Sequence, residues 1–277
     1  MLIRLSKNPN FLSFLRLFLL IISLFYIVVT IAFIQRWSIT RDAWPWTGTY
    51  SSLNELSSIF IASIAAATAG SLLWTVWMGE IAAAAGGGIN LAITFGGSGL
   101  FFAQNYLSTG NPRLLVAAII SLFLVINSLL ILRIGHHIPF KDQRPQPRLV
   151  RYSFMVFVAL LMIVGVSLVL KIPGVFPWTI SVEASVVYGW IFVGAGLYFA
   201  YALTRPGWAN TGGQLAGFLA YDLVLLYPFL VYLPNVPDRF RFSLILYIVT
   251  LLYSTALAIY YLFINPATRT GRPNLSA

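Results

Sequence analysis

The chain has 277 residues, of which 59% are hydrophobic and only 9% are Asp, Glu, Lys or Arg, against about 45–50% and about 25% in soluble globular domains. With a mean hydropathy of +0.86, this composition excludes a soluble globular protein, because most of the surface must face lipid. The net charge of +10 is interpreted as membrane topology, since Lys and Arg collect in cytoplasmic loops, and no nucleic-acid partner is expected.

Long apolar runs bounded by charge, proline or glycine predict transmembrane helices. The first run is longer than the apolar core of a signal peptide and lacks a small-x-small cleavage pattern, so it predicts a retained helix. The second and third runs are separated only by Gly79 and Glu80, where we expect a tight turn. In chain order the predicted spans are 17–34, 56–78, 82–107, 114–132, 152–170, 184–203, 214–233 and 242–263.

The predicted fold class is an all-α integral membrane protein, a polytopic bundle of about eight transmembrane helices with short loops, forming one domain over residues 1–277. With the N-terminus inside, eleven Lys and Arg fall on inner segments and six on outer ones. This excess favours cytoplasmic N- and C-termini in a plasma or bacterial inner membrane. Seven spans with one re-entrant run is the alternative. No repeat is evident, although four plus four helices would permit an inverted or parallel duplication.

Small residues recur every four positions along the third span, at Ala84, Gly88, Ala92 and Gly96, and the second span carries a similar face. In lipid, small residues let helix backbones approach closely. We therefore expect the second and third helices to pack on each other, with Gly96 in close contact. The alternative is that the glycines leave the third helix pliable beside a pathway.

Asp222 is the sharpest single feature, because it lies about eight residues into its span, roughly 12 Å along the helix axis and near the bilayer middle. An intramembrane acid is by default a functional-site hypothesis. No Lys or Arg lies deep in any span, so the sequence predicts either a neutral carboxyl facing the bundle interior or one that accepts hydrogen bonds from Tyr, Asn, Gln or Thr. Asn90, Thr94 and Asn127 are the candidate companions in an intramembrane polar site. Pro228 predicts a bend just beyond the acid.

Other polar features have plainer interpretations. We expect Glu80 to be a solvated carboxylate at the inner turn. His136 and His137 are the only histidines, and neighbouring side chains on a helix diverge by about 100°; with no cysteine in the chain, no metal or other cofactor is expected. Residues 141–151 hold two prolines and four basic residues and are interpreted as an inner loop held against anionic lipid.

The sequence carries no Gly-x-Ser-x-Gly, HExxH or P-loop motif, and without converging catalytic groups an enzyme is disfavoured. The favoured hypothesis is a non-catalytic membrane subunit, sensor or scaffold, whose partners are the lipid bilayer and other membrane proteins. The first alternative is a transporter of a small solute, proton or cation that uses the midplane acid. A lipid-modifying membrane enzyme is the second.

Overall fold

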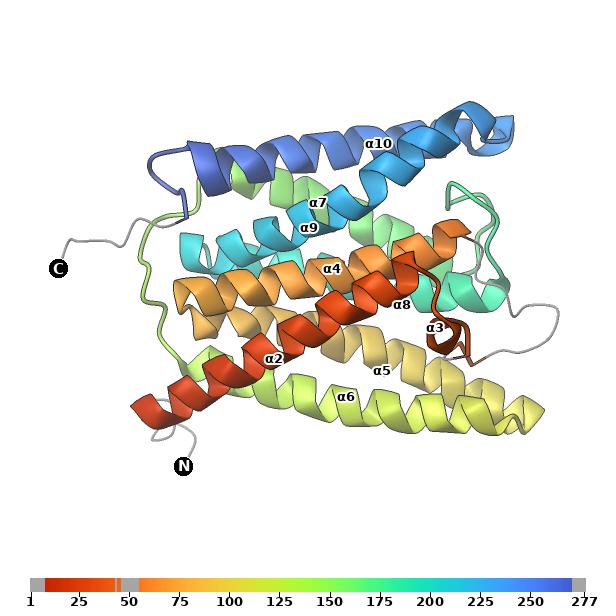
Figure 1. The fold of residues 1–277 in the computed structure, drawn as a ribbon, viewed down its shortest axis with the longest axis horizontal. Helices are drawn as coiled ribbons and strands as arrows, with labels where there is room; N and C mark the ends of the chain where they lie inside the picture. The colour runs from red at the N-terminus through yellow and green to blue at the C-terminus, as the bar shows by residue number, and fades with distance from the viewer. Residues whose placement is uncertain (1–7, 43, 46–54, 271–277) are drawn as a thin grey trace.

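Eight helices in the described part of the chain are long and apolar enough to cross a membrane (Figure 1). The computed structural model describes residues 8–42, 44–45 and 55–270, and no strand occurs among them. The long helices are α2 (Pro9–Ile34), α4 (Glu55–Met78), α5 (Ala84–Thr109), α6 (Pro112–His137), α7 (Arg148–Val169), α8 (Val182–Thr204), α9 (Trp208–Tyr232) and α10 (Asp238–Ile259). Short helical segments are α3 (Ser38–Asp42), η1 (Ile81–Ala83), η2 (Leu233–Asn235) and η3 (Tyr260–Ile264).

Helix ends follow local capping rather than hydropathy alone. Helix α2 begins at Pro9, not at residue 17, because the Asn8 side chain accepts hydrogen bonds from the backbone N–H groups of Asn10, at 2.9 Å, and Phe11. Proline is well suited to the first helical position, where its missing N–H is not needed. The predicted break between the second and third spans is confirmed, since Gly79 has a φ of +69°, a conformation that glycine adopts readily.

The long helices pack in a different order from the one that we predicted. Helix α4 lies along α2 and α9, whereas α5 lies along α6 and α8. A Cβ on Gly70 of α4 would lie 2.8 Å from the Ala216 carbonyl oxygen of α9, so these two backbones are in direct contact. The prediction that the second and third helices pack closely is wrong, because a small-residue face permits close approach without specifying a partner.

The stripe of small residues on α5 meets α6. A Cβ on Gly88 would lie 2.7 Å from the Ser128 carbonyl oxygen and 2.8 Å from the Leu132 backbone nitrogen. At Gly96, by contrast, the nearest atom belongs to Val125 of α6, at 3.9 Å. The close contact expected between the second and third helices at Gly96 is therefore not found, and the stripe instead approaches α6 closely at Gly88, two turns earlier.

The helix contacts repeat when the chain is divided into two halves. Exchanging α2 with α7, α4 with α8, α5 with α9 and α6 with α10 turns each principal contact into another principal contact. Matched helices run in the same direction (Figure 1), so the relation corresponds to a parallel duplication. Because α4 packs on α9 and α8 packs on α5, each half completes the packing of the other.

Individual contacts follow the same correspondence. Gly70 of α4 meets Ala216 and Ala220 of α9, while Gly194 of α8 meets Asn90 and Thr94 of α5. Similarly, Gly212 lies against Trp74, and Gly86 lies against Tyr198. The residue numbers of matched positions differ by one constant amount between α4 and α8, as for Gly70 with Gly194 and Trp74 with Tyr198. They differ by a second constant amount between α5 and α9, as for Asn90 with Ala216 and Gly86 with Gly212. A Pro-Trp-Thr tripeptide also precedes both α4 and α8, at 45–47 and 177–179, a short repeat that sequence inspection missed.

Because α4 of the first half packs on α9 of the second, and α8 of the second half packs on α5 of the first, we expect that neither half folds alone. A chain cut within the connection 138–147 and expressed as two fragments should yield a stable complex only when both fragments are present. Co-purification of an untagged second half with a tagged first half measures this. A single half that is monodisperse and melts cooperatively on its own would contradict the expectation.

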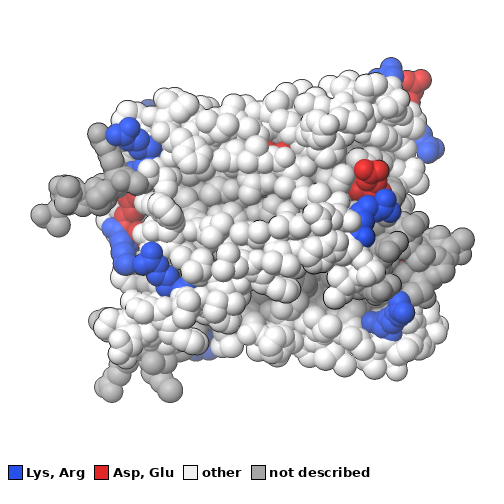
Figure 2. All heavy atoms as spheres, viewed as in Figure 1, with Lys and Arg blue, Asp and Glu red and all other residues white. Residues whose placement is uncertain are grey.

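Charged side chains gather at the two ends of the face seen in Figure 2, and the broad middle is almost uncharged. The start of α2 and the end of α10 lie at the same end of the bundle (Figure 1), as an even number of crossings requires. The first three apolar runs each form a full-length helix. The seven-span alternative with a re-entrant run is therefore not supported.

Candidate functional site

Asp222 lies in the middle of α9 with only 1% of its surface exposed. Its Oδ2 accepts hydrogen bonds from Ser254 Oγ, at 2.7 Å, and from Thr255 Oγ1, at 3.1 Å. Both hydroxyls come from α10, which packs along α9. The carboxyl therefore faces the contact between these two helices.

The second carboxyl oxygen, Oδ1, is buried and has no hydrogen-bond partner among the described residues. A buried polar atom without a partner costs about 1–3 kcal/mol, so such atoms require an explanation. This oxygen is free to take a proton or to coordinate a small cation. One carboxyl oxygen of Asp222 is therefore hydrogen-bonded within the protein, and the other is available to bind an ion.

No cationic group of the described chain neutralises Asp222. The two ion pairs in that part of the molecule, Arg144 with Asp142 and Arg241 with Asp238, lie near helix ends. Within the same residues, no group of three or more His, Cys, Asp or Glu side chains is arranged to hold a metal ion. Any ion at Asp222 would therefore be held by one carboxyl and its hydroxyl neighbours.

Tyrosine hydroxyls lie on the same pair of helices. Tyr221 of α9 is hydrogen-bonded through its hydroxyl to Tyr247 of α10, and its ring packs edge-on against Phe60 with centroids 6.4 Å apart. Tyr227, also on α9, has 75% of its surface exposed. The α9–α10 contact thus contains a second polar pair directly beside Asp222 in the chain.

The residues predicted to accompany Asp222 have other hydrogen-bond partners. Thr94 Oγ1 donates to Asn90 Oδ1, at 3.3 Å, and to the Trp190 carbonyl of α8, at 3.4 Å. The Asn127 side chain donates to the Phe123 carbonyl of its own helix, at 2.8 Å. The structure therefore brings Asp222 together with hydroxyls of α10 and not with these three side chains.

The acid occurs in only one of the two halves. By the spacing that relates α5 to α9, the position matching Asp222 is Gly96, and the position matching Ser254 is Ser128 of α6. Ser128 Oγ donates to the Leu124 carbonyl of its own helix, at 2.7 Å. The matched position therefore offers a buried hydroxyl and some open space but no carboxyl.

Helix α9 continues through Pro228 to Tyr232 without interruption, although proline cannot donate to the carbonyl of Val224. The helix also begins at Trp208, ahead of the predicted start at residue 214. Every residue from 208 to 215 is buried, and Gln214 Nε2 donates to the Tyr198 carbonyl of α8, at 2.9 Å. Sequence reasoning missed this polar first part because its residues lower the hydropathy.

Glu80 is buried, with 2% of its surface exposed, which overturns the prediction of a solvated carboxylate. Its two oxygens accept backbone N–H bonds from Lys141, at 3.1 Å, and from Asp142, at 2.7 Å. These donors lie on the connection between α6 and α7. The acid therefore attaches this connection to the α4–α5 turn, a role without a sequence signature because any residue supplies a backbone N–H.

Burial raises the pKa of Glu80 from its usual 4.5, although the two backbone N–H bonds act in the opposite direction. The folded chain therefore binds the Glu80 proton more tightly than the unfolded chain does, and this contribution to stability is present at low pH and lost as pH rises through the raised pKa. Glu80→Gln stays neutral at every pH. We expect its melting temperature in detergent to fall less than that of wild type as pH rises above about 4.5. Parallel pH curves for the two proteins would contradict this.

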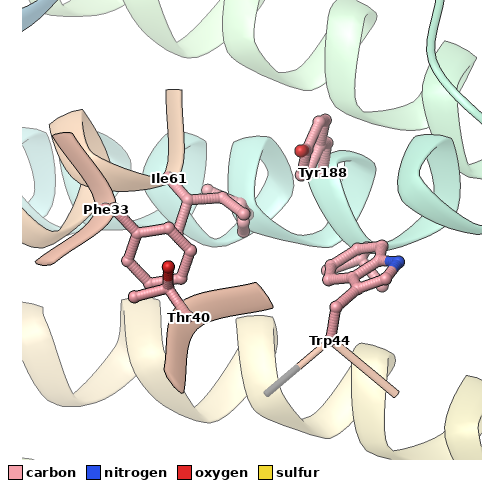
Figure 3. A pocket seen from close by; sticks show the side chains of 7 residues that line it. Phe33, Thr40, Trp44, Ile61 and Tyr188 are labelled. Carbon is pink, nitrogen blue, oxygen red and sulfur yellow. The ribbon is translucent and has the colours of Figure 1, made fainter. Parts of the chain in front are cut away.

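An apolar pocket of about 200 Å³ lies near the end of α2. Phe33, Thr40, Trp44, Ile61 and Tyr188 surround it (Figure 3), together with two aliphatic residues of α8. Asp222 is not among its lining residues. The pocket could accommodate an apolar group and is separate from the buried acid.

Comparison with known proteins adds no assignment, because no family model, no curated protein and no solved structure matches this chain.

Proposed function

We propose that this chain is a multi-pass membrane protein that moves protons across the bilayer, or exchanges them for a small cation, with Asp222 as the group that binds the ion. The observation that carries the proposal is the carboxyl in the middle of α9, with one oxygen held by two hydroxyls and the other buried without a partner. An acid at this depth is costly to keep in lipid. Retaining it without a cationic partner is consistent with a role in ion binding.

The chemistry follows from the two carboxyl oxygens. Ser254 and Thr255 donate to Oδ2 and fix the orientation of the group, while Oδ1 takes the proton. Losing the proton leaves a charge that the two hydroxyl donors only partly stabilise, so a cation would be favoured in its place. Transport further requires that α9 and α10 open the carboxyl to one side of the membrane at a time.

The excess of basic residues on the segments that share an end with the start of α2 favours cytoplasmic termini. In the proposed orientation the Glu80 turn and the 138–147 connection face the cytoplasm. A reporter fused after Ala277 should then read as cytoplasmic, and an external signal would overturn the orientation.

A non-catalytic subunit or scaffold is the second candidate. It is favoured by the closed packing around Asp222, which has 1% of its surface exposed and borders neither the apolar pocket near the end of α2 nor the pocket between the α6–α7 and α8–α9 connections. In that case the acid serves only as a hydrogen-bonding link between α9 and α10.

Ion flux in proteoliposomes separates the two candidates. Vesicles containing the purified protein and a trapped pH-sensitive dye are given an acidic interior, with valinomycin and K⁺ holding the membrane potential near zero. With equal K⁺ on both sides, addition of Na⁺ outside then tests for exchange, and omission of Na⁺ tests for simple proton movement. We expect the pH gradient to decay faster than in protein-free vesicles. Equal decay under every condition would favour the scaffold.

A further inference from the structure

A second, polar pocket lies at the end of the bundle that holds the Glu80 turn. It has a volume of about 250 Å³ and is formed by the connection between α6 and α7 and the connection between α8 and α9. Its lining includes Phe140, Asp142, Arg144, Arg205 and Gly207. The two guanidinium groups have different surroundings, and this difference indicates what the pocket can bind.

Arg144 is fully engaged within the protein. Its guanidinium forms an ion pair with Asp142, with Nε 3.0 Å and 2.9 Å from the two carboxylate oxygens and Nη2 2.5 Å from Oδ2. Nη1 donates to the Ala267 carbonyl, at 3.2 Å, and the Arg144 carbonyl accepts the backbone N–H of Trp208, at 2.8 Å. This arginine therefore builds the wall of the pocket, and its charge is compensated.

Among the residues that the structure describes, Arg205 is held in place without a counter-ion. Its Nη1 donates to the Tyr201 hydroxyl, at 3.0 Å, and its Cζ lies 4.8 Å from the centroid of the Phe140 ring. No carboxylate of the described residues lies within ion-pairing distance of it. A guanidinium fixed over an aromatic ring, with its charge uncompensated, is well suited to bind an anion.

The start of α9 adds to the positive potential of the pocket. Gly207 precedes the 25-residue helix, whose Trp208 N–H donates to the Arg144 carbonyl and whose first turn has no side-chain cap among the described residues. A helix N-terminus carries a partial positive charge that favours anions. Asp142 is already paired with Arg144, so the net charge presented to a ligand is that of Arg205 and the helix end.

We propose that this pocket binds a phosphate group, with Arg205 as the principal ligand-binding residue. Arg forms bidentate hydrogen bonds with phosphate oxygens, and the pocket lies where the proposed orientation puts anionic lipid headgroups. The phosphate can belong to a phospholipid headgroup or to a free anion, and both present the same oxygens. The binding chemistry is independent of Asp222.

Thermal unfolding of the purified chain in detergent tests the site with two probes. Inorganic phosphate is titrated against chloride at constant ionic strength, and mixed micelles containing phosphatidylglycerol are compared with phosphatidylcholine. Arg205→Gln removes the one charge in the pocket that has no ion-pair partner among the described residues. Arg151→Gln removes one charge from an exposed position at the same end of the bundle and serves as the matched control.

We expect at least one probe to raise the melting temperature of wild type and of Arg151→Gln. For Arg205→Gln the apparent affinity should fall about tenfold, as for loss of a charge-assisted hydrogen bond. Stabilisation by phosphatidylglycerol alone identifies a lipid headgroup as the ligand, and stabilisation by both probes shows that the phosphate group suffices. Equal responses of wild type and Arg205→Gln, or no response of wild type, would overturn the proposal.

Chemical footprinting keeps the test valid even if Arg205→Gln does not fold. Wild-type protein is treated with an arginine-specific dicarbonyl reagent, and modification is quantified by mass spectrometry at Arg205 and Arg151. We expect the stabilising probe to slow modification of Arg205 severalfold and to leave Arg151 unaffected. Equal rates at Arg205 with and without the probe would contradict binding. Because flux through Asp222 is not measured, failure here leaves the proposed ion movement standing.

Discussion

Asp222→Asn is expected to fold and to lose the pH-gradient decay of the wild-type protein. Asparagine has the shape of the protonated acid and keeps an oxygen that accepts from Ser254 and Thr255, but it cannot release a proton. Flux in proteoliposomes, normalised to the amount of reconstituted protein, should fall to the level of protein-free vesicles. Unchanged flux in this variant would remove Asp222 from the mechanism.

Asp222→Leu provides the matched comparison for stability. Leucine leaves the Ser254 and Thr255 hydroxyls without their acceptor at Asp222, and a buried unsatisfied group costs about 1–3 kcal/mol. Without the acid, the single Ser254 hydroxyl proton can turn to carbonyls of its own helix that lie within hydrogen-bonding distance, which places the expected loss towards the lower end. The leucine variant should therefore melt below the asparagine variant. The reverse order would show that the hydroxyls do not depend on the acid.

Gly88→Ala is expected to destabilise the protein by about 1–3 kcal/mol, as for other overpacked sites. The new Cβ would lie 2.7 Å from the Ser128 carbonyl oxygen and 2.8 Å from the Leu132 nitrogen. Both atoms belong to the backbone of α6, so α5 and α6 must separate to accommodate the methyl group. Thermal unfolding in detergent measures the loss.

Gly96→Ala is the control for this substitution. It lies on the same stripe of the same helix, and its Cβ would meet only Val125, at 3.9 Å. Both variants gain the same intrinsic helix propensity, about 1 kcal/mol over glycine. Gly96→Ala should therefore melt at or above the wild-type temperature while Gly88→Ala melts below it. Equal melting temperatures would contradict the close α5–α6 contact at Gly88.

Hydropathy was sufficient to predict the eight long helices, because each must be about 20 apolar residues long to cross a bilayer. The turn at Gly79 was predicted for the same reason, as the point where an apolar stretch too long for one span had to break. Hydropathy did not predict that α2 begins at Pro9, where a side-chain cap sets the helix start, or that α9 begins at Trp208, where buried polar residues form the first turns. These features depend on hydrogen bonds and tertiary burial that hydropathy does not record.

Helix partners could not be predicted, since small residues on α4 suit any neighbour that approaches closely. The same limitation applies to the site. Asp222 was identified by its depth in the span, but Ser254 and Thr255 are ordinary hydroxyls in an apolar run, and only the packing of α9 on α10 selects them. The burial of Glu80 could not be predicted, because its hydrogen-bond partners are backbone N–H groups that leave no mark in the sequence.

Infrared spectroscopy of the reconstituted protein tests most directly whether Asp222 binds a proton. Difference spectra between successive pH values should contain a carboxyl C=O stretching band, with a matching carboxylate band of opposite sign, that is present in wild type and missing from Asp222→Asn. Identical spectra for the two proteins across the pH series, with both folded, would contradict the account.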